Sequence, residues 1–372
     1  MKSLLLFVTL SLAVYAQAQD SSLLKERLNP ATSVKNQQAS GTCWSFGTTS
    51  MVESEGLRKG QSEPDISVMF SVRNIYIDKA KNYILRQGAA RFDEGGLGHD
   101  VIHAMGTYGI VPASAYSGKA EGVKYYAHGK MVNEMKTYLD SLLKSRYPLP
   151  DKWLDTIVVI LDKYMGAPPA TFQYNGKTYT PQSYAKEVIK FNEDDYVGFT
   201  SFTHHPFNTR FILEVPDNFS NGAYYNVPLE ELMNIIRTSV SKGYTVAWDA
   251  DVSNPGWNPG RGYALAPEVD SLMYAKNFTP DITEKKVTQE SRQRLFEELI
   301  TQDDHMMHIT GMGQRPNGKT YFTVKNSWGS AGPFHGYLNV SEAYLATNTI
   351  SIVVPKAALD KALRALVTKG EK

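Results

Sequence analysis

The sequence has a single cysteine, Cys43, among 372 residues. A chain with one cysteine has no internal disulfide, so its stability must come from core packing, which a 42% hydrophobic content can supply. Beyond residue 18 no stretch approaches the roughly 18 uninterrupted apolar residues that a membrane-spanning helix needs. Charge of neither sign is in excess, with 39 basic and 38 acidic residues, and nothing in this balance indicates a nucleic-acid partner.

The first eighteen residues have the three-part pattern of a signal peptide. Lys2 supplies a positive start, Leu4–Val14 is a largely apolar run, and Ala16–Ala18 is a small-x-small cleavage site. The alternative, an N-terminal membrane anchor, is disfavoured because the apolar run is short for spanning a bilayer. We therefore expect residues 19–372 to be exported to the periplasm or the extracellular space, without membrane association after cleavage.

The distribution of helical and extended patterns predicts an α+β protein. Helical periodicity recurs in the N-terminal half, at Ser71–Leu85, at His99–Tyr108 and over about 114–165. A helix at 228–242 leads into sheet, and the segment from Thr301 onward is predicted to be mostly antiparallel strands. Because the chain exceeds the size at which a single core usually stops growing, we expect two subdomains.

Cys43 is a candidate nucleophile because of what surrounds it. It begins a run with helical spacing that includes Phe46, Ser50 and Glu53. A thiol at the start of a helix feels the positive end of the helix dipole, which lowers its pKa and favours the thiolate. An unpaired cysteine in an exported protein supports a reactive role, whereas the alternative is a buried and inert thiol.

A histidine and an asparagine that could serve this cysteine lie near the C-terminus. Met306–Met312 and Thr320–Val324 are predicted strands, and Asn317-Gly318 marks the turn between them. Such a hairpin brings its two ends, His305 and Asn326, side by side. The asparagine can then fix the imidazole tautomer, so that the other ring nitrogen faces the thiol.

Two neighbours of His305 allow other interpretations. His308 is its main rival, but positions three apart on a strand face opposite sides, so only one can face Cys43. Asp303 and Asp304 could form a carboxylate site. We interpret them instead as local charge that raises the histidine pKa and helps to hold a thiolate–imidazolium pair.

We expect neither a metal nor an organic cofactor. His99 and His103 have the spacing of metal ligands on a helix, but neither an HExxH pattern nor a third ligand accompanies them. His204 and His205 are expected to be solvated loop residues. Asp249 and Asp251, near a strand end, lack an EF-hand loop and are expected to be solvated as well.

Three sequence blocks together resemble one family. They are NQQASGTCWSF around Cys43, DEGGLGHDVIHAMGTYGIVP from Asp93 to Pro112, and DDHMMHITGM followed by VKNSWG. The chain resembles papain-superfamily cysteine peptidases of the bleomycin hydrolase and aminopeptidase C branch. This resemblance implies a catalytic Cys43, a general base His305, an orienting Asn326, an oxyanion donor Gln37, substrate-backbone contacts at Gly95 and Gly96, and a shielding Trp328.

The resemblance also implies a papain-like fold of two subdomains, with a helical N-terminal half and an antiparallel C-terminal half. In simple papains the histidine follows the cysteine by about 130–150 residues, whereas here it lies roughly a hundred residues further on. We therefore expect a largely helical inserted subdomain at about 113–225 within a peptidase domain of residues 19–372. The chain departs from the common pattern at Gly41-Thr42 and at Ser40, where many papains have a cysteine.

The function implied is hydrolysis of peptide bonds by an aminopeptidase with possible endopeptidase activity. A transglutaminase-type acyl transferase is one alternative, but such enzymes usually orient the histidine with an aspartate, and here Asn326 is present. An inactive peptide-binding protein on a peptidase scaffold is another, and the complete set of four catalytic positions argues against it.

The C-terminal tail bears on substrate choice. In the family a C-terminal arm folds into the cleft, where its carboxylate meets the free amine of the substrate. Here the strand Ile350–Val354 and a helical stretch, Lys356–Val367, leave only Thr368–Lys372, whose two lysines would repel an ammonium. We expect that N-blocked peptides are also cleaved. The family further implies a homohexamer, although this chain is shorter than typical relatives.

Overall fold

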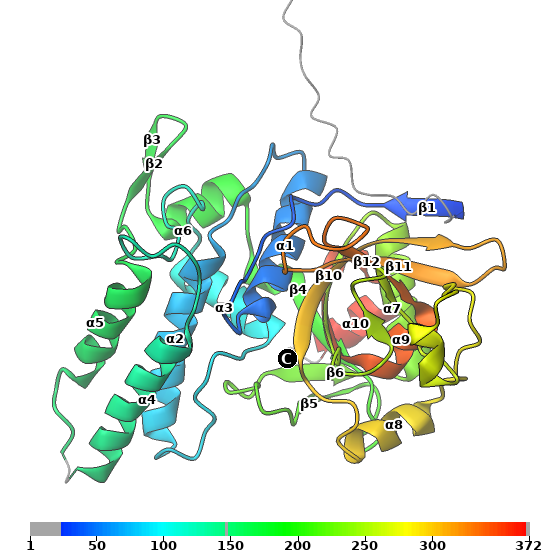
Figure 1. Ribbon diagram of the computed structural model, residues 1–372. Helices are drawn as coiled ribbons and strands as arrows, with labels where there is room; N and C mark the ends of the chain where they lie inside the picture. Colours follow the sequence, from blue (N-terminus) through cyan, green and yellow to red (C-terminus); the bar gives the residue numbers. More distant parts are fainter. Residues whose placement is uncertain (1–23, 146–147, 370–372) are drawn as a thin grey trace, which may run out of the picture.

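The structure, a computed structural model, describes residues 24–145 and 148–369 (Figure 1). The predicted signal peptide, residues 1–18, and the last three residues of the tail lie outside this described part. Within it, no helix combines the length and apolarity needed to cross a membrane.

Five helices build one half of the molecule, on the left in Figure 1. They are α1 (Cys43–Arg58), α2 (Val68–Leu85), α3 (Gly98–Tyr108), α4 (Gly129–Lys144) and α5 (Trp153–Met165). The helix α2 lies at their centre and contacts the other four. Buried residues of α4 and α5 recur every three or four positions, as expected for amphipathic helices. The helical prediction for 114–165 is correct from Gly129 onward, whereas residues 114–128 contain no helix.

The other half is built on one sheet, on the right in Figure 1. The sheet has eleven strands in the order β5-β6-β4-β13-β7-β10-β11-β12-β9-β8, with β1 paired to β10. Pairing is antiparallel except between β9 and β12 and between β4 and β6. The strands are β1 (Leu24–Leu28), β4 (Tyr196–Thr200), β5 (Thr209–Ile212), β6 (Ala223–Asn226), β7 (Val246–Ala250), β8 (Trp257–Asn258), β9 (Tyr263–Ala264), β10 (His305–Gln314), β11 (Thr320–Lys325), β12 (Tyr337–Ser341) and β13 (Thr349–Pro355).

Helices cover both faces of this sheet. On the face away from α1, α7 (Leu229–Ser241), α9 (Glu342–Asn348) and α10 (Lys361–Lys369) share an apolar cluster with the strands. Buried on both faces, strand β7 has no exposed residue, so its sequence is almost continuously apolar. The remaining elements are α8 (Gln289–Glu297), α6 (Pro181–Tyr184), η1 (Ala185–Ile189), η2 (Glu193–Asp195), η3 (Asp270–Tyr274), η4 (Lys356–Ala358) and the hairpin of β2 (Phe172–Tyr174) with β3 (Lys177–Tyr179).

Helix α1 joins the two halves, because it packs against β10 and β7 as well as α2 and α3. Its residues from Trp44 to Gly56 are all buried, so the helix is enclosed on every side. Close approach to the sheet depends on Gly47, where an added Cβ would lie 3.0 Å from the carbonyl oxygen of Met307. This packing sets Cys43, the first residue of α1, against the beginning of β10.

The α+β class and the papain-like arrangement are confirmed, and so is the antiparallel hairpin of β10 and β11. The predicted insertion, 113–225, contains α4, α5 and the β2–β3 hairpin, but its last third forms β4, β5 and β6 of the large sheet. Its limits as a subdomain stay a prediction. The predicted C-terminal helix is interrupted, since η4 ends at Ala358 and α10 begins at Lys361.

Candidate active site

Cys43 and His305 line one cleft of about 570 Å³ between the two halves of the molecule. Gln37, Gly95 and Trp328 line the same cleft, so five of the seven predicted site residues meet there. Asn326 is buried behind His305. Gly96 lies against the indole of Trp44, because a Cβ added at Gly96 would be 3.1 Å from the indole ring. All seven residues therefore belong to the cleft or directly adjoin it.

The imidazole of His305 is held in one orientation by Asn326. Its Nε2 lies 2.8 Å from Oδ1 of Asn326, and the same Oδ1 accepts a hydrogen bond from the backbone N–H of Ser327 at 2.7 Å. The amide group therefore presents its oxygen to the ring, and Nε2 of the neutral imidazole must be the donor. Nδ1 then carries the lone pair that can accept a proton.

Trp328 covers the imidazole. Its ring stacks on His305 with centroids 4.7 Å apart and planes inclined by 30°. The indole is 39% exposed, whereas His305 is 4% exposed, so the tryptophan stands between the histidine and solvent. The backbone of Trp328 also pairs with that of Asn36, which ties this loop to the segment before Cys43.

The side-chain amide of Gln37 is oriented by two hydrogen bonds. Its Oε1 accepts from the hydroxyl of Ser327 at 2.6 Å, and its Nε2 donates to the carbonyl of Ser40 at 2.8 Å. An amide nitrogen has two hydrogens, so one remains available. Cys43, the first residue of α1, adds a backbone N–H that has no acceptor within the helix.

Burial controls the charges of the two central groups. It raises the pKa of Cys43 to about 12, with a further rise from the carboxylates of Asp303 and Asp249. Burial also lowers the pKa of His305 to about 4. The free thiol therefore has a raised pKa instead of the lowered pKa expected from the helix start, because desolvation raises it.

The two acidic residues before His305 also differ from expectation. Asp303 shares a hydrogen bond with Asp249, and burial raises the pKa of Asp303 well above its usual range and that of Asp249 to about 7. The Asp303–Asp249 pair retains a proton at neutral pH. The prediction that Asp303 and Asp304 raise the pKa of His305 is wrong, because burial lowers that pKa and only the hydrogen bond to Asn326 acts in the other direction. Asp249 and Asp251 are each 1% exposed rather than solvated. Asp249 lies within the doubly covered strand β7, and the carboxylate of Asp251 accepts hydrogen bonds from the backbone N–H groups of Ser253 and Gln302.

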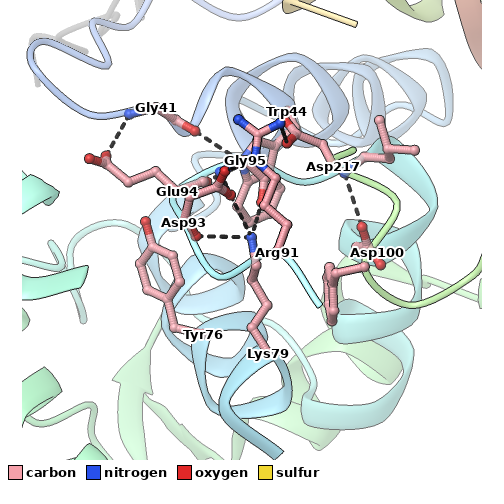
Figure 2. A network of polar contacts seen from close by, with 12 residues as sticks. Gly41, Trp44, Tyr76, Lys79, Arg91, Asp93, Glu94, Gly95, Asp100 and Asp217 are labelled. Carbon is pink, nitrogen blue, oxygen red and sulfur yellow. Dashed lines mark hydrogen bonds and ion pairs between the residues drawn. The ribbon is translucent and has the colours of Figure 1, made fainter. Parts of the chain in front are cut away.

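The glycine loop beside the cleft is fixed by a polar network (Figure 2). The buried ammonium of Lys79 donates to the carbonyls of Asp93 and Gly95, at 2.9 and 2.5 Å. Glu94 accepts a hydrogen bond from the backbone N–H of Gly41 at 2.7 Å, and its own carbonyl accepts from the indole of Trp44 at 2.9 Å. The loop is thereby held against the segment that leads into Cys43.

The other candidate histidines lie away from Cys43. His308 is buried further along β10 and does not line the cleft; its Nδ1 is 2.9 Å from the hydroxyl of Ser50 in α1. His99 and His103 have separate partners, the hydroxyl of Tyr224 and the carboxylate of Glu193. The two imidazoles of His99 and His103 therefore hydrogen-bond different groups.

His204, His205 and Glu214 form a group whose atoms lie within 4.8 Å of one another, a spacing compatible with a metal ion. However, the amide nitrogen of Gln293 donates to Nδ1 of His204 at 3.0 Å, and its oxygen is fixed by the backbone N–H of Thr203. Nε2 of the neutral His204 must then carry the proton and donate to Glu214. Both imidazoles therefore hydrogen-bond the carboxylate of Glu214.

Comparisons with known proteins show what the chain is similar to. Residues 89–371 match the Peptidase C1-like family. Aminopeptidase C of Listeria monocytogenes is 24% identical over 89% of this chain and 81% of its own length, and bleomycin hydrolase of Mus musculus is 22% identical over 87% and 80%. The crystal structure of PepW from Lactobacillus rhamnosis superimposes with a TM-score of 0.72 at 18% identity, covering 92% of this chain and 84% of that one.

Proposed function

Since this chain belongs to the Peptidase C1-like family and is a cysteine-type peptidase, we propose that Cys43, His305 and Asn326 carry out its chemistry. The observation that supports this most is the hydrogen bond from Nε2 of His305 to Asn326, which leaves Nδ1 free in the cleft that Cys43 lines. The proposed reaction is hydrolysis of peptide bonds in peptide substrates, as in the aminopeptidase C and bleomycin hydrolase relatives.

Acylation begins with transfer of the Cys43 proton to Nδ1 of His305. Neither charged form is stable alone in this buried site, but the transfer creates thiolate and imidazolium together, and their attraction offsets the desolvation. The sulfur attacks the scissile carbonyl to form a tetrahedral oxyanion. Nε2 of Gln37 and the backbone N–H of Cys43 donate to this oxyanion. The imidazolium then protonates the leaving amine, and a thioester remains.

Deacylation uses the same groups in reverse. Nδ1 of His305 takes a proton from water, and the oxygen attacks the thioester carbonyl. The second oxyanion is held by the same two donors, and the thiolate leaves and regains its proton from the imidazolium. The products are an amine, released in the first step, and a carboxylic acid, released in the second.

The experiment that tests this assignment uses an epoxysuccinyl inhibitor, which alkylates the single thiol of the chain. We expect stoichiometric labelling of the wild-type protein and a large loss of labelling rate in His305→Ala. Release of free amine from peptides in water, without an added acyl acceptor, then separates a peptidase from a transglutaminase-type acyl transferase. Labelling that is equally fast in His305→Ala would contradict the assignment.

Export is part of the proposal as well. We propose that cleavage after Ala18 releases the protein from the membrane to the periplasm or the extracellular space. Mass determination of the protein recovered from the exported fraction should then give a chain that begins at Gln19. The hexamer implied by the resemblance stays a prediction, which sedimentation of this protein would test.

A further inference from the structure

An acidic side chain that does not belong to the predicted site faces the cleft from the segment between β5 and β6. Asp217 lines the same cleft as Cys43 and His305, and its carboxylate lies directly over Gly95 (Figure 2). A Cβ on Gly95 would lie 2.0 Å from Oδ2 of Asp217, so only glycine allows the carboxylate to come this close. The negative charge of Asp217 raises the pKa of the Cys43 thiol.

This carboxylate lacks a full set of partners. Oδ1 of Asp217 is shielded from solvent and accepts no hydrogen bond within the described part of the chain. The nearest cation, Nη1 of Arg91, lies 3.4 Å away, and the guanidinium is also paired with Asp93. A buried carboxylate oxygen without a donor is costly, which indicates that a donor from outside belongs there.

The charges around Asp217 define what kind of donor fits. Lys79 and Arg91 both pair with Asp93, while Asp217 and Glu94 add two further carboxyl groups to the same loop region. The region is therefore short of positive charge. A substrate ammonium would supply both the missing charge and up to three N–H donors.

No part of the C-terminal segment supplies this anion within the described residues. Leu363 and Val367 of α10 are buried in the cluster formed with α7, and the carbonyl of Val367 accepts from Tyr225 at 2.8 Å. Residues 356–368 contribute nothing to the lining of the cleft. Four acidic residues of the described chain line the cleft, Asp93, Glu94, Asp217 and Asp304. Among these four, only Asp217, from the β5–β6 segment, has a buried carboxylate oxygen without a hydrogen bond.

We propose that Asp217 binds an ammonium group of the peptide substrate and thereby selects peptides with a free N-terminus. The inference rests on the proposed function, because it places the peptide across Cys43 and the glycine loop. A lysine side chain of the peptide near the scissile bond could also provide the ammonium group. The two sources differ in where the charge is attached to the peptide, so matched substrates can separate them.

The test compares a peptide without ionisable side chains in two forms, one with a free N-terminus and one N-acetylated. A third peptide is N-acetylated and carries lysine next to the residue that precedes the scissile bond. In Asp217→Asn we expect kcat/KM to fall about 10- to 100-fold for the free-amine peptide, the range for one charge-assisted hydrogen bond. The loss should appear mainly in KM, and the uncharged N-acetylated peptide should be cleaved at the wild-type rate or faster.

A matched control is Glu214→Gln, which removes an exposed carboxylate from the same β5–β6 segment outside the cleft. It should affect all three peptides equally little. Equal losses in Asp217→Asn for the free-amine and N-acetylated peptides would show a structural role and overturn the proposal, as would no loss for any of them. A loss confined to the lysine-containing peptide would assign Asp217 to a side-chain ammonium instead of the N-terminus.

A binding measurement keeps this test independent of the proposed catalysis. Calorimetry on Cys43→Ser should show tighter binding of the free-amine peptide than of its acetylated form, and Cys43→Ser/Asp217→Asn should remove the difference. If the wild-type protein cleaves no peptide but the double variant loses the difference in binding, the proposed function is refuted and the ammonium site stands. Persistence of the difference without Asp217 would refute the ammonium site alone.

Discussion

Replacement of Gln37 by alanine tests the proposed oxyanion hole. The structure shows one Nε2 hydrogen of Gln37 bonded to the carbonyl of Ser40 and leaves the other for the oxyanion. A single such donor is worth about 2.7–4 kcal/mol in the transition state, so kcat should fall by roughly 10²–10³. KM should change little, because the bond strengthens chiefly as negative charge develops.

Two further variants distinguish the oxyanion donor itself from the residues that orient or neighbour it. Ser327→Ala removes the hydroxyl that donates to Oε1 of Gln37, so the amide loses a bond worth about 1 kcal/mol and kcat should fall only several-fold. Gln38→Ala is the neighbouring control, since the exposed side chain of Gln38 bonds the backbone N–H of Tyr126 away from the thiol. Its kcat should remain near that of the wild type.

The assay is steady-state hydrolysis of a fluorogenic peptide, with active sites counted by stoichiometric labelling of Cys43. Thermal unfolding of each variant checks that the loop remains folded, because Gln37 is buried and its loss frees the Ser327 hydroxyl. A fall in kcat for Gln38→Ala as large as that for Gln37→Ala would show that the oxyanion donor has been assigned to the wrong residue.

Three other predictions concern charge and the thiol. Cys43→Ser should abolish nearly all activity and all thiol labelling without changing the thermal unfolding midpoint by more than a few degrees, and hydrolysis near the wild-type rate would contradict the assignment of the nucleophile. Asp217→Asn should lower the pKa of Cys43, because one of the negative charges that raise it is removed, so the pH profile of alkylation should move to lower pH. Burial lowers the pKa of Lys325 to about 8; the unfolded chain then binds more protons above that pH, and stability should rise between about pH 8 and 10.5. This rise, on the order of 3 kcal/mol, should be absent in Lys325→Met when unfolding free energies are measured in urea.

The parts of the fold that could be predicted are those with local signals. Asn317-Gly318 and the alternation on either side of it specify the β10–β11 hairpin, and that hairpin places His305 beside Asn326. The helical run after Cys43 begins at the cysteine itself, as expected. In both cases neighbouring residues carry the information, so no knowledge of the rest of the fold is needed.

The parts that could not be predicted depend on contacts between distant segments. Asp217 reaches Gly95 from the segment between β5 and β6, and nothing in its own surroundings in the sequence marks it. The parallel pairing of β4 with β6 at the far side of the sheet is equally non-local. The prediction that Asp249 is solvated is wrong, although a carboxylate within an apolar strand indicates a buried group with a partner.

Burial also links substrate charge to the reactivity of the thiol. In the free cleft, desolvation and the carboxylates of Asp303, Asp249 and Asp217 keep Cys43 protonated. An ammonium bound at Asp217 would cancel one of these charges close to the sulfur, so the thiolate would form more readily when a peptide with a free N-terminus is present. Binding energy at the N-terminus would then lower the cost of forming the nucleophile and raise kcat as well as affinity. Acetylated peptides would lack this assistance, so the wild-type protein should cleave them with a lower kcat than free-amine peptides. In Asp217→Asn the kcat values of the two kinds of peptide should become similar if the carboxylate causes the difference. If the acetyl group itself causes it, the difference in kcat should persist.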